Sequence, residues 1–546
     1  MKETVFEADV LCVGGGIAGL MAAIHAADSG ARVIVAEKAN TLRSGNGATG
    51  NDHFRCYIPE FHGPDVQPLV EEVAHSQVGN ARTMNTVRVW MENSFDIVKL
   101  WDSWGIPMKY KGTWEFAGHT LPGRPFTTLK YSGQQQKPVL TREARKRGVQ
   151  IVNRVTVFDL LCESDRVMGA IGLDSRENQL VVFRAGAVIL CTGTCVRLYP
   201  GIAPGWNFNR AYCAATTGDG RAMAYRAGAE LINVEMPQRW AGPKYMARCG
   251  KATWVGVVKD PDGKPVGLMS KPDRKYGDAI ADAYHTLFAD YAKLGKAPLY
   301  MDCRDASDED LDYMKYWLVH EGNMAMLNHM NEEGIDLKKH AVEFTTYELT
   351  TAGGVRFNEK SETSLKGLYA AGDEYFGGIS AAAVFGWLAG ENAANYAKRA
   401  KASDVAVARE TVDQKMSLLS GMLSRSSGAS WQEANIALQQ TMQDYAGGVR
   451  SETMLQAGLA HLGRLKEKAY NGMLAGNPHE LMHCIEVLNL FDVGELVFLA
   501  SLERKETRGG FIRPDYPYAN PLLNNKLLVC KMVNGKPVTE WIQMKG

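Results

Sequence analysis

The chain has 546 residues, which is long enough for roughly two to four structural units around a large buried core. Its 61 basic and 61 acidic residues cancel, so no overall charge would attract nucleic acid or an anionic membrane surface. The ten cysteines are scattered along the sequence, which argues against a disulfide framework and against a metal or iron–sulfur site formed by this chain.

Residues 8–38 form the most informative segment of the sequence. The apolar residues at 10–13 predict a buried strand, residues 17–28 predict an apolar helix, and residues 32–36 predict a second strand that ends at Glu37. Strand, glycine turn, helix and strand in this order are typical of a Rossmann-like unit. The segment therefore predicts an α/β fold.

Three glycines in this segment match the dinucleotide-binding fingerprint. Gly14 permits the tight turn, Gly16 lets a pyrophosphate approach the backbone, and Gly19 lets helix and strand pack closely. Glu37 lies where a carboxylate can accept hydrogen bonds from an adenosine ribose, and its charge would repel a 2′-phosphate. A purely structural glycine turn is the alternative, and these four residues by themselves allow either a nicotinamide or a flavin nucleotide.

The apolar run at residues 10–27 could be taken for a signal peptide or a membrane span. It contains three consecutive glycines and His25, and acidic residues precede it where a signal peptide is basic. We therefore expect a cytoplasmic chain with no membrane span.

The segment 40–54 is rich in small residues, which lets a chain run past a flat cofactor. From here the sequence resembles the flavoprotein subunits of succinate dehydrogenase and fumarate reductase, L-aspartate oxidase and the alpha subunit of adenylylsulfate reductase. In that superfamily the matching loop crosses the isoalloxazine, and members with a covalent flavin have a histidine after the serine. Here Gly45 follows Ser44, so the resemblance implies FAD held non-covalently.

Three later segments carry the same resemblance. They are Cys-Thr-Gly at 191–193, Thr-Gly-Asp-Gly at 217–220 and Gly-Leu-Tyr-Ala-Ala-Gly-Asp at 367–373. The small residues at 380–383 would begin a helix whose N–H groups face the flavin pyrimidine. The FAD contacts implied by the resemblance are Gly14, Gly16, Ile17, Ala18, Gly19, Glu37, Lys38, Ser44, Gly45, Gly47, Thr49, Gly50, Val155, Cys191, Thr192, Gly193, Asp219, Gly372, Asp373, Ser380 and Ala381.

The resemblance covers nearly the whole chain and implies its domains. It predicts a Rossmann-like FAD-binding domain at residues 1–230 and 341–403, an inserted α+β capping domain at 231–340 and a C-terminal helical domain at 404–546. The helical pattern up to about residue 502, followed by two short strands, agrees with this division.

The residues that clamp a dicarboxylate in fumarate-reducing members are not matched. Leu349 stands where the superfamily has a substrate histidine, and the insertion that carries a clamping arginine is missing between residues 375 and 382. Gly277 and Asp278 fall near the place of the proton-donating arginine. A dicarboxylate substrate is therefore not expected.

The shortened flavin loop resembles the adenylylsulfate reductase branch more closely. Asn51 and Trp254 match a flavin-side asparagine and a substrate-packing tryptophan of that branch, but Leu349 replaces its histidine as well. We therefore expect a paralogous enzyme that acts on another small, anionic molecule. The candidate catalytic residues are Asn51, Arg239, Trp254 and Arg274, and the acid–base candidates are His53 and His119.

Each of these candidates has a simpler alternative, since an arginine could be a solvated surface charge and the tryptophan a core residue. The leading hypothesis is the catalytic flavoprotein subunit of an oligomer, which holds no metal itself and exchanges electrons with a separate ferredoxin-like iron–sulfur subunit. One alternative is a stand-alone ene reductase resembling fumarate reductase, or a flavin oxidase resembling L-aspartate oxidase. Another is an electron-relay flavoprotein without a substrate of its own.

Overall fold

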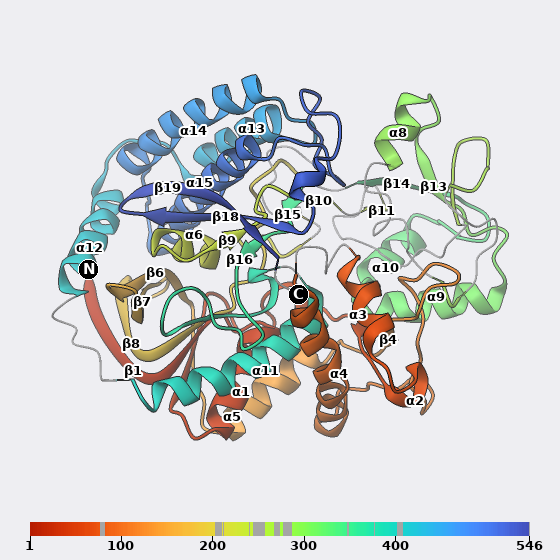
Figure 1. The fold of residues 1–546 in the computed structure, drawn as a ribbon, viewed down its shortest axis with the longest axis horizontal. Coiled ribbons are helices and arrows are strands. Elements are labelled where there is room, and N and C mark those ends of the chain that lie inside the picture. The colour runs from red at the N-terminus through yellow and green to blue at the C-terminus, as the bar shows by residue number, and fades with distance from the viewer. Residues whose placement is uncertain are drawn as a thin grey trace.

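A computed structural model describes residues 1–76, 82–201, 210, 212–239, 241–243, 257–266, 274–276, 287–346, 349–375, 377–400 and 408–544 (Figure 1). Its central layer is a seven-stranded sheet with the order β5-β2-β1-β8-β7-β6, in which β17 also pairs with β8. Strands β5, β2, β1, β8 and β17 run parallel to one another. Strands β7 and β6 extend the sheet beyond β8 with antiparallel pairing. The predicted α/β fold is thus confirmed. The strands are β1 (Lys2–Val13), β2 (Val33–Glu37), β5 (Gln150–Asn153), β6 (Val155–Glu163), β7 (Arg166–Asp174), β8 (Gln179–Leu190) and β17 (Leu368–Ala370).

Strand β1 is longer than the sequence predicts. It begins at Lys2, because its first half pairs with β8 from Lys2↔Gln179 onward. That half is only partly buried and includes Glu3 and Glu7, so it lacks the apolar run that marks residues 10–13. The helix and the second strand fall as predicted, at α1 (Ile17–Asp28) and β2.

Helices α1, α5 (Gln136–Lys146) and α11 (Gly378–Ala397) lie together along one face of the sheet (Figure 1). Two glycines let α11 approach α1 at backbone distance. A Cβ added at Gly386 would lie 2.4 Å from the Ala18 carbonyl oxygen, and one at Gly390 would lie 2.2 Å from that of Ala22. Since neither position has room for a methyl group, the spacing of the two helices depends on these glycines.

In the described part of the chain, two helices follow between residues 67 and 104, and Trp90 and Trp101 of the second one are fully buried. Its N-terminus is capped by the Thr83 hydroxyl, which accepts a hydrogen bond from Thr86 N–H. The elements of this region are η1 (Asn46–Ala48), β3 (His53–Arg55), α2 (Pro59–His62), α3 (Gln67–Ala74), α4 (Met84–Trp104) and β4 (Thr128–Lys130).

The inserted region is built around an antiparallel sheet with the order β11-β14-β13-β12, and it lies at the right of Figure 1. Its own apolar cluster includes Met314 and Trp317. The first helix of this region is described from Leu287 onward. The elements are β11 (Ala241–Pro243), β12 (Val258–Lys259), α8 (Leu287–Lys293), β13 (Leu299–Met301), α9 (Asp308–His320), α10 (Met324–Glu332) and β14 (Val342–Thr346).

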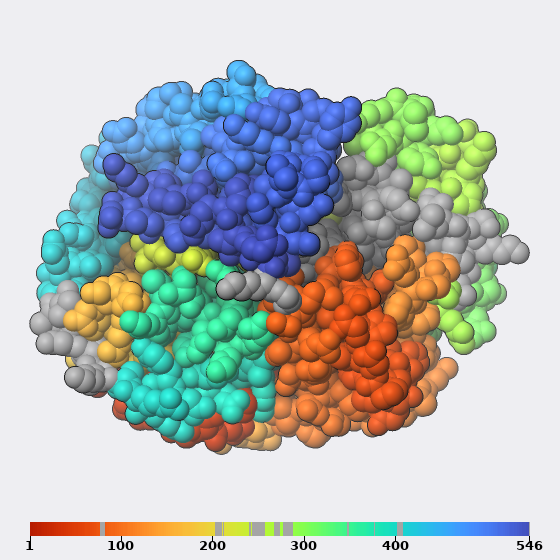
Figure 2. Space-filling view, viewed as in Figure 1, coloured from red at the N-terminus to blue at the C-terminus, as the bar shows by residue number. Residues whose placement is uncertain are grey.

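The C-terminal part is helical up to Glu503, as predicted, and α15 (Pro478–Glu503) is buried along most of its length. Figure 2 shows this part as the blue surface at the top of the molecule. The predicted strand pair also forms, and it joins β9 through β18. The remaining elements are α6 (Asp219–Arg226), β9 (Leu231–Ile232), β10 (Pro237–Gln238), β15 (Thr350–Thr351), β16 (Gly354–Val355), η2 (Gly372–Glu374), α12 (Arg409–Ser424), α13 (Trp431–Ala446), α14 (Glu452–Gly472), η4 (Pro521–Leu523), β18 (Lys526–Val533) and β19 (Lys536–Gln543).

Among the described helices, none combines the length and the hydrophobicity that crossing a membrane requires.

The α1–α11 contact gives a first prediction. Gly390→Ala should destabilise the protein by about 1–3 kcal/mol, because the new methyl group must push the two helices apart. The control is Gly463→Ala in α14, where a Cβ meets nothing within 4 Å. That change should be neutral or stabilise by up to about 1 kcal/mol. Thermal unfolding midpoints measure both effects, and equal midpoints for the two variants would contradict the prediction.

Candidate active site

The turn between β1 and α1 is packed too tightly for side chains. Gly14 has a φ of +97°, and an added Cβ would lie 2.4 Å from the Cys191 carbonyl oxygen. A Cβ at Gly19 would lie 1.8 Å from the Gly14 oxygen. Gly16 is the N-cap residue of α1 and carries no side chain that could cap the free N–H groups. The turn therefore presents backbone donors and the positive end of the α1 dipole.

In front of this turn lies a cavity of about 1060 Å³, part of it open to solvent. The walls come from the ends of β1, β2, β8 and β17, from the loop after β2 and from the start of α11. The predicted FAD contacts that line it are Gly14, Gly16, Ile17, Ala18, Glu37, Lys38, Ser44, Gly45, Gly47, Val155, Cys191, Thr192, Gly193, Asp219, Gly372 and Asp373.

The other predicted FAD contacts do not line the cavity. The Ser380 hydroxyl donates a 2.5 Å hydrogen bond to the Arg55 carbonyl and accepts one of 2.8 Å from the Trp90 indole. Gly19 is held by its contact with Gly14. At the start of α11, the residues that line the cavity are Gly378, Ile379 and Ala382. The remaining predicted contacts outside the wall are Thr49, Gly50 and Ala381.

The polar groups of the wall fit a dinucleotide. Glu37 is fixed by the Gly15 and Ala39 N–H groups, each 2.7 Å from one carboxylate oxygen. Each oxygen can accept a further hydrogen bond, which suits a ribose diol. The Ser44 hydroxyl is buried and has no hydrogen-bond partner among the described residues. A buried donor of this kind is costly unless a ligand satisfies it.

A buried lysine lies behind the glycine turn. Lys137 of α5 is fully buried, and its ammonium donates a hydrogen bond to the Gly15 carbonyl. Burial lowers the pKa of Lys137 to about 8, although the nearby Glu37 opposes this shift. The positive charge favours an anionic group at the turn, such as a pyrophosphate. The sequence analysis did not identify Lys137, because it lies in an ordinary amphipathic helix.

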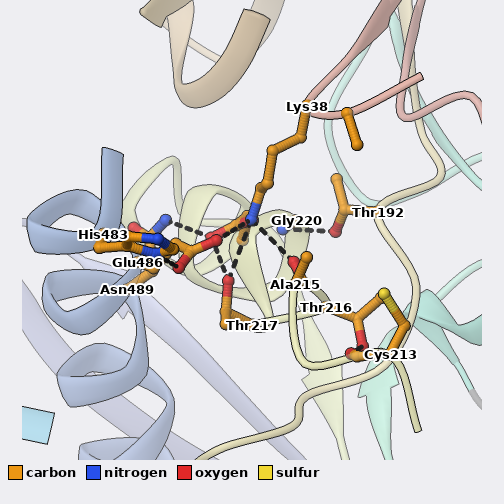
Figure 3. Close-up of polar contacts among 12 residues, drawn as sticks. Lys38, Thr192, Cys213, Ala215, Thr216, Thr217, Gly220, His483, Glu486 and Asn489 are labelled. Atoms are coloured by element: carbon orange, nitrogen blue, oxygen red, sulfur yellow. Dashed lines mark hydrogen bonds and ion pairs between the residues drawn. The ribbon is translucent and has the colours of Figure 1, made fainter. Parts of the chain in front are cut away.

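Lys38 connects the cavity wall to the C-terminal helix α15, as Figure 3 shows. Its ammonium lies 2.6 Å from Asp219 Oδ2 and 2.8 Å from Glu486 Oε1, and it also donates to the Ala215 carbonyl. Burial alone would lower the pKa of Lys38, but the two carboxylates outweigh it and raise this pKa. Asp219 also accepts a 2.7 Å hydrogen bond from the Asn489 amide.

Glu486 is the central acid of this network. Its second oxygen lies 2.6 Å from Arg197 Nη2 and 2.7 Å from His483 Nδ1. Burial would raise the pKa of Glu486, but Lys38 and Arg197 outweigh burial and lower it. Asp219, predicted as an FAD contact, thus has both oxygens engaged by protein donors as well. No local pattern points to Glu486, since it lies in a helix far along the chain.

A second buried charge cluster lies where the inserted region meets the loop after η1. Gly50 and Gly322 make this approach possible, since a Cβ at Gly50 would lie 2.6 Å from the His320 carbonyl oxygen. Asp52 is buried and lies 2.5 Å from Lys130 Nζ and 2.6 Å from His53 Nδ1. Burial would raise the pKa of Asp52, but Lys130 and His53 lower it far below its ordinary value.

Both acid–base candidates of the sequence belong to this cluster. The rings of His53 and His119 lie 4.5 Å apart. Ligand atoms of Asp52, His53 and Glu321 lie within 4.8 Å of one another, a spacing that could hold a cation. The Lys130 ammonium, however, already brings a positive charge to Asp52.

The structure places three of the four catalytic candidates, and Trp254 lies outside the described residues. Asn51 adjoins the buried charge cluster, and its side-chain oxygen accepts a 2.9 Å hydrogen bond from His53 N–H. Arg239 directly follows β10, and no described residue forms a hydrogen bond or an ion pair with it; its Nε is buried. Burial lowers the pKa of Arg239. Arg274 is exposed by 46% and pairs with Glu309 at 2.6 Å.

Leu349 stands at the position where the resemblance places a substrate histidine. It is buried and belongs to the apolar cluster formed with the C-terminal helices. Directly after it, Thr350 and Thr351 form β15, which pairs with Gln238 and Pro237 of β10. A buried core residue therefore stands at the position where the resemblance places a histidine.

Comparison with known proteins gives matches over both halves of the chain. Residues 9–384 match the family described as FAD binding domain, and residues 435–537 match the family described as Fumarate reductase flavoprotein C-term. A fumarate reductase (CoM/CoB) polypeptide of Methanothermobacter marburgensis is 26% identical over 96% of this chain and 99% of its own length. An L-aspartate oxidase of Yersinia pestis is 26% identical over 71% of this chain and 73% of its own.

Solved structures show the same fold. Adenylylsulfate reductase of Archaeoglobus fulgidus superposes with a TM-score of 0.86 at 22% identity, covering 99% of this chain and 96% of that one. Quinol fumarate reductase of E. coli superposes with a TM-score of 0.83 at 20% identity, covering 100% of this chain and 97% of that one.

The fold, the cavity and these matches define an FAD-dependent oxidoreductase. The FAD-binding match spans more than half of the sequence, so the chain belongs to the family described as FAD binding domain, and its C-terminal part matches the family described as Fumarate reductase flavoprotein C-term. The predicted resemblance, the predicted fold class and FAD as cofactor are confirmed.

The wall of the cavity gives a second prediction. Glu37→Gln should weaken FAD binding at least about tenfold, because hydrogen bonds to a charged group contribute roughly 1.5–3 kcal/mol. Titration of the apoprotein with FAD, followed by the quenching of flavin fluorescence, measures the affinity. Glu60→Gln, an exposed change in α2, is the control and should bind FAD as the unchanged protein does.

The Lys38–Glu486 network gives a third prediction. Glu486→Gln should destabilise the protein by about 3–5 kcal/mol, since it leaves Lys38 and Arg197 buried with one carboxylate fewer. Because the pKa of Glu486 is lowered on folding, its stabilisation is present above the ordinary value of 4.5 and is lost as the pH falls below it.

Unfolding midpoints between neutral and acidic pH test this. The difference between the variant and the unchanged protein should shrink as the pH falls. Glu467→Gln, exposed on α14, should leave the midpoint unchanged at every pH. A difference that is independent of pH would refute the assigned role of Glu486.

Proposed function

We propose that this chain is the catalytic flavoprotein subunit of a cytoplasmic oligomer. It carries out two-electron oxidation or reduction of a small anionic molecule and exchanges electrons with a separate iron–sulfur protein. FAD, when bound non-covalently in the cavity, supplies the two-electron chemistry. Gly45 after Ser44 supports the non-covalent mode, because no histidine is available there.

The proposal of an anionic substrate rests on Arg239. Its guanidinium belongs to a largely buried side chain, and no described residue pairs with it. A buried donor such as this Nε is costly unless an acceptor satisfies it, and an anion can be that acceptor. Arg239 also follows the strand that pairs with Thr350 and Thr351, next to the segment where the superfamily has its substrate histidine. The proposed role of Arg239 is to bind the negative charge of the substrate.

The proposed proton-transfer group is His53. Asp52 holds the Nδ1 side of the ring at 2.6 Å, and this pairing fixes the orientation of the imidazole, as in known acid–base pairs. Lys130 keeps Asp52 ionised. His119 beside it is the second candidate. Asn51 would orient the loop that carries this pair.

The separate iron–sulfur partner is supported by the cysteines. The described cysteines are free thiols, nine in all, and none of them belongs to a described cluster of ligands that could hold a metal ion. Free thiols are also in keeping with a reducing compartment. The names of several relatives describe them as subunits.

Purification of the native enzyme tests the electron partner. We expect it to carry iron and a second polypeptide in fixed ratio. A preparation that is always free of iron would exclude the partner. Rapid reoxidation by oxygen with stoichiometric peroxide would favour the oxidase alternative instead, whereas failure of every small molecule to exchange electrons with the flavin would favour the electron relay.

The anion site gives a fourth prediction. Arg239→Gln should weaken the binding of small anions at least about tenfold, because a charge-assisted hydrogen bond is lost. Sulfite and fumarate, titrated against the FAD-loaded protein, are suitable probes, with flavin absorbance as the readout. Arg304→Gln is the control, since this exposed arginine already pairs with Asp302 at 2.8 Å. Equal affinities of both variants would refute the role of Arg239.

A further inference from the structure

A buried acid lies directly behind the cavity wall. Glu374 ends η2, one residue after the cavity-lining Asp373, and its side chain is fully buried. Its Oε1 accepts hydrogen bonds from both the N–H and the hydroxyl of Thr192, each 2.5 Å long. Thr192 itself lines the cavity. Thr192 therefore links the carboxyl group to the wall of the cavity.

Two glycines make room for this acid. A Cβ at Gly220 would lie 2.3 Å from Glu374 Oε1, and a Cβ at Gly354 would lie 1.7 Å from the Glu374 carbonyl oxygen. Gly220 also donates a 2.8 Å hydrogen bond to the Thr192 hydroxyl. That hydroxyl therefore directs its own hydrogen toward Glu374. The surrounding backbone is thus shaped around a carboxyl group at this place.

The second oxygen of the carboxyl group is left without a partner. Glu374 Oε2 is buried and has no hydrogen-bond partner among the described residues, and the same holds for Arg221 Nε. No ion pair joins these two side chains in the described part of the chain. Arg221 instead donates to the Thr351 hydroxyl at 2.7 Å and to the Asp373 carbonyl at 3.0 Å. Oε2 is thus an oxygen that can carry a proton without breaking an existing contact.

The charges around Glu374 oppose one another. Burial raises the pKa of Glu374 to about 7, the Thr192 hydrogen bonds and Arg221 lower it, and Asp219 raises it. Asp373 lies on the Arg221 side. Cys191 and Cys195 also face the group, and burial raises the pKa of both thiols, so that they stay uncharged. A small change in nearby charge therefore decides whether Glu374 holds a proton.

We propose that Glu374 takes up a proton when the bound FAD accepts two electrons, and releases it when the FAD is reoxidised. The balance is FAD + 2e⁻ + H⁺ giving anionic FADH⁻, together with Glu374–COO⁻ + H⁺ giving Glu374–COOH. The electrons come from the reductant, and the proton that Glu374 takes up comes from solvent. The added negative charge on the flavin favours the neutral carboxyl group behind Thr192. Glu374 acts on the cofactor through its hydrogen bonds to Thr192, so it is a positioning residue and not a catalytic one.

This proposal depends on FAD binding but on neither the substrate nor the iron–sulfur partner. It and the proposed function can therefore fail separately. Its test is the equilibrium between oxidised and reduced FAD in the holoenzyme, measured against redox dyes from about pH 6 to about pH 9. Two protons for two electrons change the equilibrium constant about a hundredfold per pH unit, and one proton changes it about tenfold, or roughly 30 mV.

In the unchanged protein, the equilibrium constant of FAD reduction should change about a hundredfold per pH unit over a pH window that begins near neutral pH. At pH values below this window it should change about tenfold per pH unit. Glu374→Gln should show the tenfold dependence throughout. Glu391→Gln, an exposed change in α11, should behave as the unchanged protein. Thr192→Val should move the window to higher pH, because it removes a hydrogen bond to the ionised carboxylate.

A second measurement does not depend on a variant that folds. The infrared difference spectrum of the unchanged holoenzyme, reduced minus oxidised, should gain a carboxylic acid C=O band, and this band should be absent from Glu374→Gln where that variant can be prepared. A tenfold dependence at every pH in the unchanged protein, with no such band, overturns the proposal.

Discussion

The structure depends on the close approach of backbones around α1. At Gly14 and Gly19 the turn, the helix and the end of β8 meet without side chains, and at Gly386 and Gly390 helix α11 comes equally close from the other side. Helix α1 thereby packs closely against both the sheet and α11, and its N-terminus opens on the cavity. Any side chain at these contacts would move the helix end, and with it the donors on which the binding of a pyrophosphate depends.

Buried charges then determine how the outer parts attach to this frame. Lys38 ties the cavity wall to α15 through Glu486, and Lys130 with Asp52 lies where the inserted region meets the loop after η1. Such pairs contribute little net stability compared with apolar packing, because both charges lose their water. The Lys38 pair is specific, however, since a shift of α15 would leave a buried charge without this partner. The geometry of the site is therefore linked to the docking of distant segments.

The cofactor half of the site could be predicted because its determinants are local. A glycine spacing, an acid at the end of a strand and a short turn each leave a mark within about twenty residues. The buried charge cluster joins residues far apart, such as Asp52 with Lys130, and no spacing rule reaches that distance. Glu374 did leave a local sign, an acid inside a stretch of small and apolar residues. The resemblance implies that backbone N–H groups at the start of α11 face the flavin, and this stays a prediction; the Ser380 hydroxyl there donates to the Arg55 carbonyl of β3.

The partnership between Lys38 and Glu486 also has a consequence for biosynthesis. The two residues are 448 positions apart. At about 5–20 residues per second, roughly 20 to 90 seconds pass between their synthesis on the ribosome. During that interval the ammonium beside the cavity lacks one of its two carboxylates, and the wall it belongs to is incomplete. The contact that ties the cavity wall to α15 can therefore form only after this last long helix has been synthesised.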